Sequence, residues 1–223
     1  MKRIILFSVL FFGLLGCKET GSVDFGFDYF PIQEGAFVEY EVLEIYHDVN
    51  VSPQHDTTRY RLKTKVGEEF ADNTGRPVRK FFQLRYDLQT GDLIGQRVWT
   101  IVVDGGRGEV VEENQRKVKM VFSVKNAVEW NVNAFNPFSR QDVYYSNVGE
   151  SQSINSFTFD ETAKVNYEDF SSLVDHRKKY EVYARGVGLV ERRFKDLTIQ
   201  NFDTTAIQKG TEVHYELINY GIE

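Results

Sequence analysis

Polar and apolar side chains alternate with a period of two over much of this chain. In "TTRYRLKTKV" every second position from Arg59 on is arginine or lysine, and the positions between them are Tyr60, Leu62, Thr64 and Val66. This pattern predicts a β-strand with one face toward a core and one face toward solvent. Similar alternation predicts further strands over 78–86, 93–103, 118–124 and 157–167.

Short glycine- and aspartate-containing segments separate these strands. "LQTGDL" and "VDGGRGE" hold the residue types that tight hairpin turns require, so we expect neighbouring strands to pair as a meander. "YEVYARGVGLVERRF" and "TEVHYELINY" predict one closing strand each, with Gly186 and Gly188 forming a bulge or bend inside the first. Helical periodicity is weak, and "DFSSLVDH" (169–176) is the best candidate for a helix.

These patterns predict an all-β protein with few helices. We expect a single antiparallel curved sheet, or an open β-barrel or half-barrel, forming one domain over residues 29–223. The 18 phenylalanines and 12 tyrosines suit a pleated surface, and we expect the concave side to collect them. Trp99 and Trp130 are interpreted as packing residues rather than ligand platforms.

The N-terminus has the layout of a bacterial export signal. Lys2 and Arg3 precede an apolar run over 4–15, which is too short to span a bilayer as a helix. Leu14-Leu15-Gly16-Cys17 resembles the lipobox, in which the cysteine sulfur carries diacylglycerol. We therefore expect a signal peptide over 1–16, lipidation at Cys17 and a tether over 17–28, with a free thiol as the alternative. Because Cys17 is the only cysteine, a disulfide within the chain is excluded.

Three segments carry a resemblance to a known group. "YFPIQEGAFVEYEV", "VEWNVNAFN" and "YEVYARGVGLVERRF" resemble the opening, middle and closing elements of uncharacterised outer-membrane lipoproteins of the bacteroidete type. The chain departs from that pattern at Phe37, where tryptophan is frequent, and at Val132, where glycine is usual. The resemblance implies an outer-membrane location and brings no known chemistry. Lys18 and Glu19, directly after Cys17, resemble the charged export tags of surface lipoproteins in this group, which favours the surface over the periplasmic face.

Charge argues against one class of partner. Without residues 1–16 the chain keeps 25 of its 27 basic side chains against 33 acidic ones, a formal net charge of −8. Nucleic-acid binding needs clustered lysine and arginine, whereas "HRKKYE" and "VERRFK" are short and interleaved with acids. We therefore expect no nucleic-acid partner.

Motifs for catalysis or cofactor binding are absent from the sequence. Neither HExxH, a P-loop, GxSxG nor a dinucleotide fingerprint occurs, so no catalytic residue and no cofactor are assigned. "HDVNVSPQHD" brings His47, Asp48, His55 and Asp56 together along the chain. These residue types can bind a divalent ion, but exposed loop histidines with turn-forming aspartates are the preferred interpretation, and no metal is assigned. The pairs Glu68-Glu69 and Glu112-Glu113 lie near predicted turns and are expected to be solvated.

Two functions remain open. The first is a non-enzymatic accessory or binding module for an outer-membrane protein partner or a hydrophobic ligand. The alternative is a glycan-directed hydrolase of the envelope or cell surface that uses unidentified carboxylates. Separately, "DTT" occurs twice and resembles an O-glycosylation acceptor of exported bacteroidete proteins, so Thr57 and Thr204 are candidate acceptors on exposed loops, with simple aspartate turns as the alternative.

Overall fold

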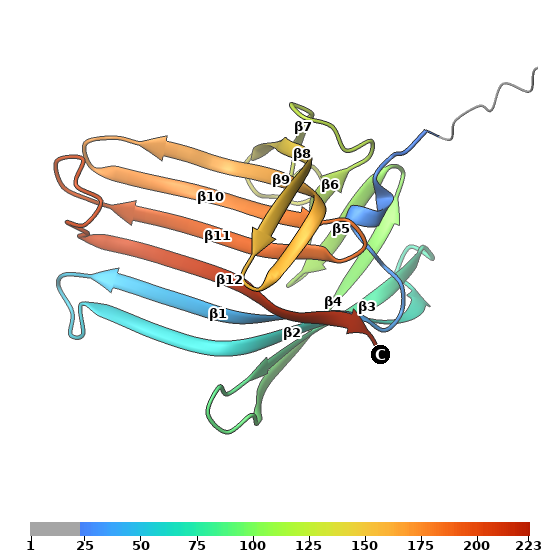
Figure 1. The fold of residues 1–223 in the computed structure, drawn as a ribbon, viewed down its shortest axis with the longest axis horizontal. Helices are drawn as coiled ribbons and strands as arrows, with labels where there is room; N and C mark the ends of the chain where they lie inside the picture. Colours follow the sequence, from blue (N-terminus) through green and yellow to red (C-terminus); the bar gives the residue numbers. More distant parts are fainter. Residues whose placement is uncertain (1–22) are drawn as a thin grey trace, which may run out of the picture.

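Nearly all of the described chain is β-strand. The computed structural model describes residues 23–223, and Figure 1 shows their long antiparallel strands. A single 3-10 turn, η1 (Phe27–Tyr29), precedes the strands. The strands are β1 (Ala36–Asp48), β2 (His55–Ala71), β3 (Pro77–Tyr86), β4 (Leu93–Asp104), β5 (Arg107–Glu112), β6 (Gln115–Val121), β7 (Glu129–Asn131), β8 (Asp142–Ile154), β9 (Phe157–Ser171), β10 (Asp175–Ala184), β11 (Gly188–Thr198) and β12 (Lys209–Ile222).

All twelve strands belong to one antiparallel sheet. Its spatial order is β6-β5-β4-β3-β2-β1-β12-β11-β10-β9-β8-β7, so two six-strand meanders meet where β1 pairs with β12. Each strand otherwise pairs with its neighbour in sequence, as hairpin turns at 87–92 and 105–106 predict. The predicted all-β class and curved antiparallel sheet are confirmed.

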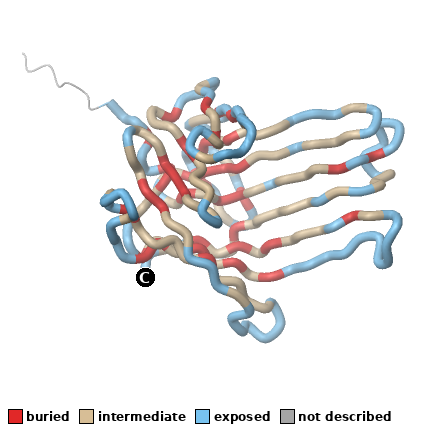
Figure 2. Tube along the Cα trace, turned by 180° about the vertical axis from the view of Figure 1, so that it is seen from behind, coloured by how far each residue is buried: buried red, intermediate tan, exposed pale blue. Residues whose placement is uncertain are grey.

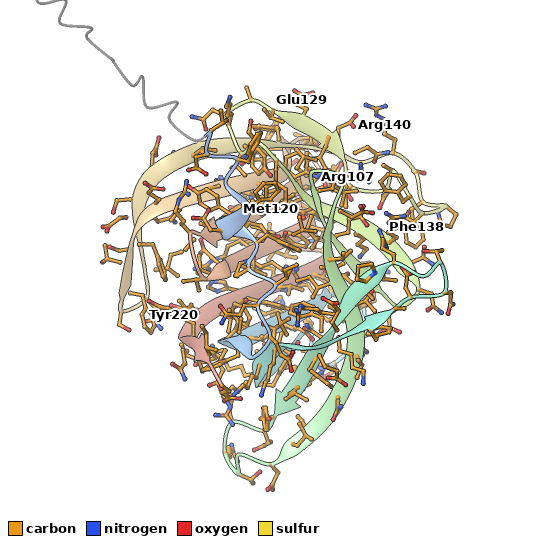
Figure 3. The ribbon with its side chains drawn as sticks, turned by 90° about the vertical axis from the view of Figure 1, so that its right-hand side faces the viewer. Arg107, Met120, Glu129, Phe138, Arg140 and Tyr220 are labelled. Atoms are coloured by element: carbon orange, nitrogen blue, oxygen red, sulfur yellow. The ribbon has the colours of Figure 1, made fainter. Side chains whose placement is uncertain are left out.

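The sheet curls until its two edges nearly meet, which gives it the shape of a barrel. The Val118 amide of β6 donates to the carbonyl of Val132, just after β7, at 2.9 Å, and the Trp130 indole donates to the Val118 carbonyl at 2.9 Å. Figure 3 looks at this end of the molecule, where Met120 lies in the interior while Phe138 and Arg140 lie at the periphery. Trp130 is therefore a packing residue, as expected.

Burial is concentrated in this closed end. Figure 2 shows most buried positions gathering there, whereas the far ends of the long hairpins are mostly half-buried or exposed, with His47, Leu197 and Ile199 buried among them. The predicted inward side chains of β2, from Tyr60 to Val66, are buried as expected. The buried apolar residues form two clusters, one around Met120 and Trp130 at the closed end and a second around Val42, Phe159 and Leu217.

The N-terminal segment packs across the closed end. Tyr29 and Phe30 are buried, and the Val124 amide donates to the Phe25 carbonyl at 3.1 Å. Arg185, in the β10–β11 turn, donates to both carboxylate oxygens of Asp28, at 2.9 and 2.8 Å. These contacts place the Phe30 ring inside the sheet, where it forms part of the cavity described below.

Three local predictions are wrong. The helix expected over 169–176 is a hairpin, because the Ser172 hydroxyl accepts the amides of Val174 and Asp175 and so replaces helical bonds with a turn. "YEVYARGVGLVERRF" is two strands rather than one: 185–187 form a turn, and Gly186 has a φ of 76°, which reverses the chain. The strand expected to reach 124 also ends earlier, at Val121.

Candidate functional site

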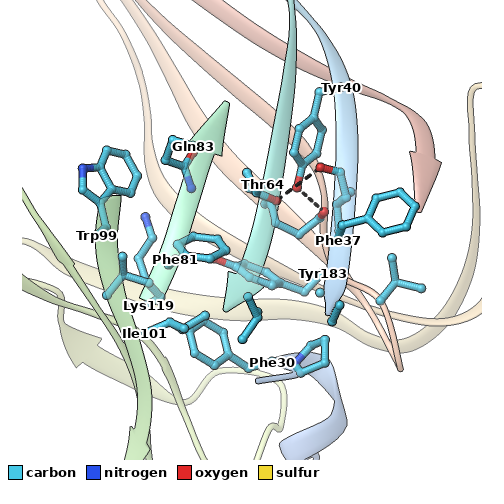
Figure 4. Close-up of a pocket in the computed structure, with 18 of the residues that line it drawn as sticks. Phe30, Phe37, Tyr40, Thr64, Phe81, Gln83, Trp99, Ile101, Lys119 and Tyr183 are labelled. Atoms are coloured by element: carbon cyan, nitrogen blue, oxygen red, sulfur yellow. Dashed lines mark hydrogen bonds between the residues drawn. The ribbon is translucent and has the colours of Figure 1, made fainter. Parts of the chain in front are cut away.

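A cavity lies inside the sheet near its closed end. Its volume, measured as the space open to the centres of water molecules, is about 90 Å³, which is room for several waters. Figure 4 shows its side chains converging from several strands and from the N-terminal segment. Its apolar wall is formed by Phe30, Val66, Phe81, Trp99, Ile101 and Val110.

The strand register builds this wall. Val66 on β2 pairs with Phe81 on β3, and Phe81 pairs with Trp99 on β4, so the three side chains lie side by side on one face. Trp99 lines the cavity, so the interpretation of Trp99 as a packing residue is incomplete. The alternation of polar and apolar residues predicts which face of the sheet Trp99 lies on, but it does not predict a cavity beside that face. An aromatic wall of this kind suits an apolar ligand group.

A buried ion cluster forms the polar end of the cavity. Glu181 has no exposed surface and accepts hydrogen bonds from Arg192 Nε at 2.8 Å and Lys119 Nζ at 3.3 Å. The hydroxyls of Tyr167 and Tyr183 donate to its other oxygen at 2.7 and 2.8 Å. Burial alone would raise the pKa of the Glu181 carboxyl, but Lys119 and Arg192 lower it well below its ordinary value.

Glu112 is the second carboxylate of this cluster. Burial alone would raise its pKa, but Lys119 and Lys117 hold it below its ordinary value, and Lys117 Nζ donates to it at 2.7 Å. The expectation of a solvated Glu112 is wrong, because its strand turns the side chain inward, whereas the Glu113 side chain is 68% exposed. The side chains of Glu68 and Glu69 are exposed as expected. Both carboxylates of the cluster are therefore held ionised, and of the two only Glu112 lines the cavity.

A more polar groove adjoins the cavity and shares three wall residues with it, Gln83, Trp99 and Tyr215. The groove measures about 480 Å³. Arg85 lies along it with its guanidinium 3.6 Å from the centre of the Tyr60 ring. Gln83 Nε2 and Arg85 Nε are buried and have no hydrogen-bond partner. Sequence reasoning missed both residues, because alternation places them on the inner face but says nothing of their partners.

The histidine cluster is only partly assembled. His47 Nδ1 and His55 Nδ1 lie 2.8 Å apart across β1 and β2, and Glu212 of β12 lies 3.1 Å from His47 Nε2. His47 is buried in a strand, so the expectation of an exposed loop histidine is wrong for it. Within residues 23–223, no group of three or more His, Cys, Asp or Glu side chains is arranged to hold a metal ion.

The predicted modification sites have different outcomes. Cys17 lies outside the described residues, and its lipidation stays a prediction. Thr204 lies in an exposed turn, but the neighbouring Asp203 carboxylate accepts the amide of Thr205, as the aspartate-turn alternative expects. Thr57 is exposed but lies in strand β2, so the loop expected there is wrong. Glycosylation stays a prediction, which the intact mass of the native protein and of Thr57→Ala and Thr204→Ala variants would test.

Comparisons with known proteins give two structural similarities. No family model and no curated protein matches the chain. A candidate lipoprotein of Parabacteroides distasonis has 15% identity and a TM-score of 0.40, over 85% of this chain and 98% of that chain. A candidate exported protein with a YmcC-like fold from Bacteroides fragilis has 12% identity and a TM-score of 0.42, over 86% of this chain and 98% of that one. The function must therefore be inferred from the residues of this chain. Over the described residues, no helix has the length and apolar character needed to cross a membrane.

Proposed function

We propose that this chain is a lipoprotein of the bacterial outer membrane, anchored through Cys17, and that it acts as a non-enzymatic binding module for a hydrophobic ligand. The observation that carries the binding role is the cavity at the closed end, with its wall of aromatic and aliphatic side chains. Concave, mostly apolar sites with a few polar groups are the usual form of small-molecule sites. The anchor is supported by the signal sequence and the lipobox.

The hydrolase alternative is less well supported by the carboxylates of the buried ion cluster. A glycosidase needs one carboxylic acid that remains protonated long enough to donate, and therefore a raised pKa. Glu112 and Glu181 have lowered pKa values, because lysine and arginine side chains surround them. Their arrangement favours a stable polar end to a binding cavity over general acid catalysis.

A neutral apolar dye tests the binding role. N-phenyl-1-naphthylamine should bind the wild-type protein with a rise in dye fluorescence and quenching of Trp99, which lines the cavity. Ile101→Phe should fill the cavity and weaken binding about tenfold, the effect of roughly 1.4 kcal/mol. Val98→Phe is the matched control, because Val98 is on the same strand but its side chain is half exposed. Absence of dye binding to the wild-type protein would contradict the proposal.

A second interaction, with another envelope protein, is supported by an apolar rim on the far ends of the hairpins. We define the apolar rim as Val49, Val51, Phe170, Leu173, Val174 and Phe202. The three loops that carry it are joined by backbone hydrogen bonds: the Val49 amide donates to Gln208 at 3.0 Å, and the Phe202 amide donates to Leu173 at 3.2 Å. Exposed apolar groups held together in this way are typical of an interaction surface.

The position of the rim favours a protein as its partner. In Figure 1 the described chain begins at the end of the molecule opposite these loops. Only five residues separate Cys17 from Val23, and such a segment spans about 20 Å at most. An anchor at Cys17 would therefore hold the closed end near the bilayer. The apolar rim, at the opposite end, would then point away from the bilayer. We propose that the rim docks on an apolar surface of an outer-membrane protein.

A further inference from the structure

Two residues of β3 that line the groove, Gln83 and Arg85, each hold a buried N–H donor without an acceptor. Gln83 is 8% exposed, and its Nε2 has no hydrogen-bond partner among the described residues. Arg85 Nε is also buried and unpartnered. Because leaving a buried donor unsatisfied is costly, such donors call for an acceptor from outside the chain, either a ligand or an ordered water.

The two donors are aligned by the strand. Gln83 and Arg85 are two positions apart on β3 and therefore project from the same face. Gln83 pairs with Thr64, and Arg85 pairs with Leu62, which are inward positions of β2. The Tyr60 ring lies 3.6 Å from the Arg85 guanidinium and limits how it can turn. The donors therefore form a fixed pair along the groove.

Charge around this pair favours an anion. Within residues 23–223, no carboxylate forms an ion pair with Arg85, which leaves its charge without a partner on the protein. The groove walls carry Arg85, Arg97 and one carboxylate, Glu44. Arg97 is paired with Glu113 at 3.7 Å, so Arg85 is the cation of the groove that has no carboxylate partner. The Glu44 carboxylate already accepts the Tyr60 hydroxyl at 2.6 Å. An oxyanion is the ligand group that guanidinium and amide donors bind most strongly.

Gln83 also lines the aromatic cavity, so the polar and apolar sites are continuous. Figure 4 shows the Gln83 side chain between Trp99 and Thr64, with Phe81 and Ile101 deeper along the wall. A ligand whose oxyanion lies against Gln83 and Arg85 can therefore place an apolar tail against Trp99 and Phe81. The groove alone would bind only the oxyanion, and the cavity alone would bind only the apolar tail.

We infer that the ligand is an anionic amphiphile, with a carboxylate or phosphate head on Gln83 and Arg85 and an aliphatic tail in the cavity. This inference rests on the proposed binding function and adds the class of ligand. The carboxylate and phosphate share the oxygens that accept from the two donors. A neutral amphiphile with the same tail lacks the charge that Arg85 would neutralise.

Three probes with one tail length test the inference: decanoate, decyl phosphate and 1-decanol. Binding is measured by titration calorimetry and by Trp99 fluorescence. At least one anionic probe should bind about tenfold or more tightly than 1-decanol, since hydrogen bonds to charged groups are the stronger class. Tighter binding of decanoate assigns a fatty-acid type of head, and tighter binding of decyl phosphate assigns a lipid-phosphate type.

Variants separate the head site from the cavity. Gln83→Leu and Arg85→Met should weaken the preferred anionic probe about tenfold and leave 1-decanol unchanged. Arg61→Met is the matched control, because Arg61 also lies over a tyrosine ring, at 4.6 Å from Tyr86, but on the opposite face of the sheet. It should leave all three affinities unchanged.

The outcomes distinguish this inference from the proposed function. Equal affinity for 1-decanol and the anionic probes, or unchanged anion binding in both head-site variants, would overturn the inference and leave the apolar cavity as a binding site. In that case ordered water satisfies Gln83 and Arg85. Failure of all three probes together with the neutral dye would overturn the proposed function itself.

Discussion

Glu181 is the residue on which the polar end of the cavity depends most. Glu181→Gln keeps its size but removes the carboxylate that pairs with Arg192, and it leaves Lys119 with Glu112 alone, at 3.7 Å. We expect a loss of about 3–5 kcal/mol in the free energy of unfolding at neutral pH, as for other broken buried ion pairs. Urea unfolding would measure it. Glu69→Gln is the control, because its carboxylate is largely exposed and should matter little.

The same variant has a predicted pH dependence. The pKa of Glu181 is lowered in the folded protein from its ordinary value of 4.5. Its stabilisation is therefore fully present above about pH 4.5 and is lost as the pH falls toward the folded-state pKa. The difference in unfolding free energy between wild-type and Glu181→Gln protein should therefore narrow as the pH falls from about 5 to about 3, because Glu181 becomes protonated in the unfolded chain while it stays ionised in the folded one. A difference that stays constant over this range would contradict the assignment.

At the scale of the elements, the seam between β6 and β7 decides whether the sheet closes. Trp130→Phe removes the indole donor to the Val118 carbonyl and part of a buried ring. We expect a loss of about 1–3 kcal/mol in unfolding free energy. Hydrogen exchange of the Val118 amide, which is bonded across the seam to Val132, should accelerate. Trp99→Phe is the control, since Trp99 lies away from the seam. If both variants accelerate exchange of the Val118 amide equally, the indole of Trp130 does not hold the seam closed.

The loop that carries Phe202 combines strain with exposure. Phe202 has a φ of 60° and is 64% exposed, so a bulky side chain occupies a left-handed conformation without burying its ring. Phe202→Gly should relieve this strain and raise the unfolding free energy by about 0.5–1 kcal/mol. It should also remove a main contact of the apolar rim and weaken partner docking.

Isolation of the protein from detergent-solubilised envelopes would measure the docking effect of this variant. A stoichiometric partner should be retained by the wild-type protein, lost with Phe202→Gly and retained with Phe138→Ala. Phe138 is the matched control, an aromatic residue that is 54% exposed at the opposite end. If Phe202→Gly and wild-type protein retain the same partner equally, the rim is not its docking site.

The sequence predicted strands better than it predicted their ends. Alternation identified the inward face of β2 because one buried face imposes a strict period of two. It failed at 169–176, where Ser172 forms a local turn, and at 185–187, where three residues suffice to reverse the chain. Such reversals depend on backbone angles that residue type alone does not determine.

At the scale of the whole molecule, the pairing of β1 with β12 connects the two meanders and could not be predicted from local patterns. This pairing joins positions almost a full chain apart, and the cavity is lined by residues from both meanders. The sequence therefore predicted that the residues of the aromatic wall face inward, but it did not predict the cavity that they enclose. Gln83 and Arg85 likewise resemble ordinary strand residues until their missing partners are seen.

The anchor gives the whole molecule its predicted location. Cys17→Ala removes the only sulfur that can carry lipid, so the protein should appear unprocessed or as a soluble periplasmic form. The physical reason is that stable membrane attachment depends on buried acyl chains, and a negatively charged domain adds no attraction to anionic lipid. Fractionation and incorporation of radiolabelled fatty acid would test this. If the variant still fractionates with the outer membrane and still takes up the label, the lipobox assignment is wrong.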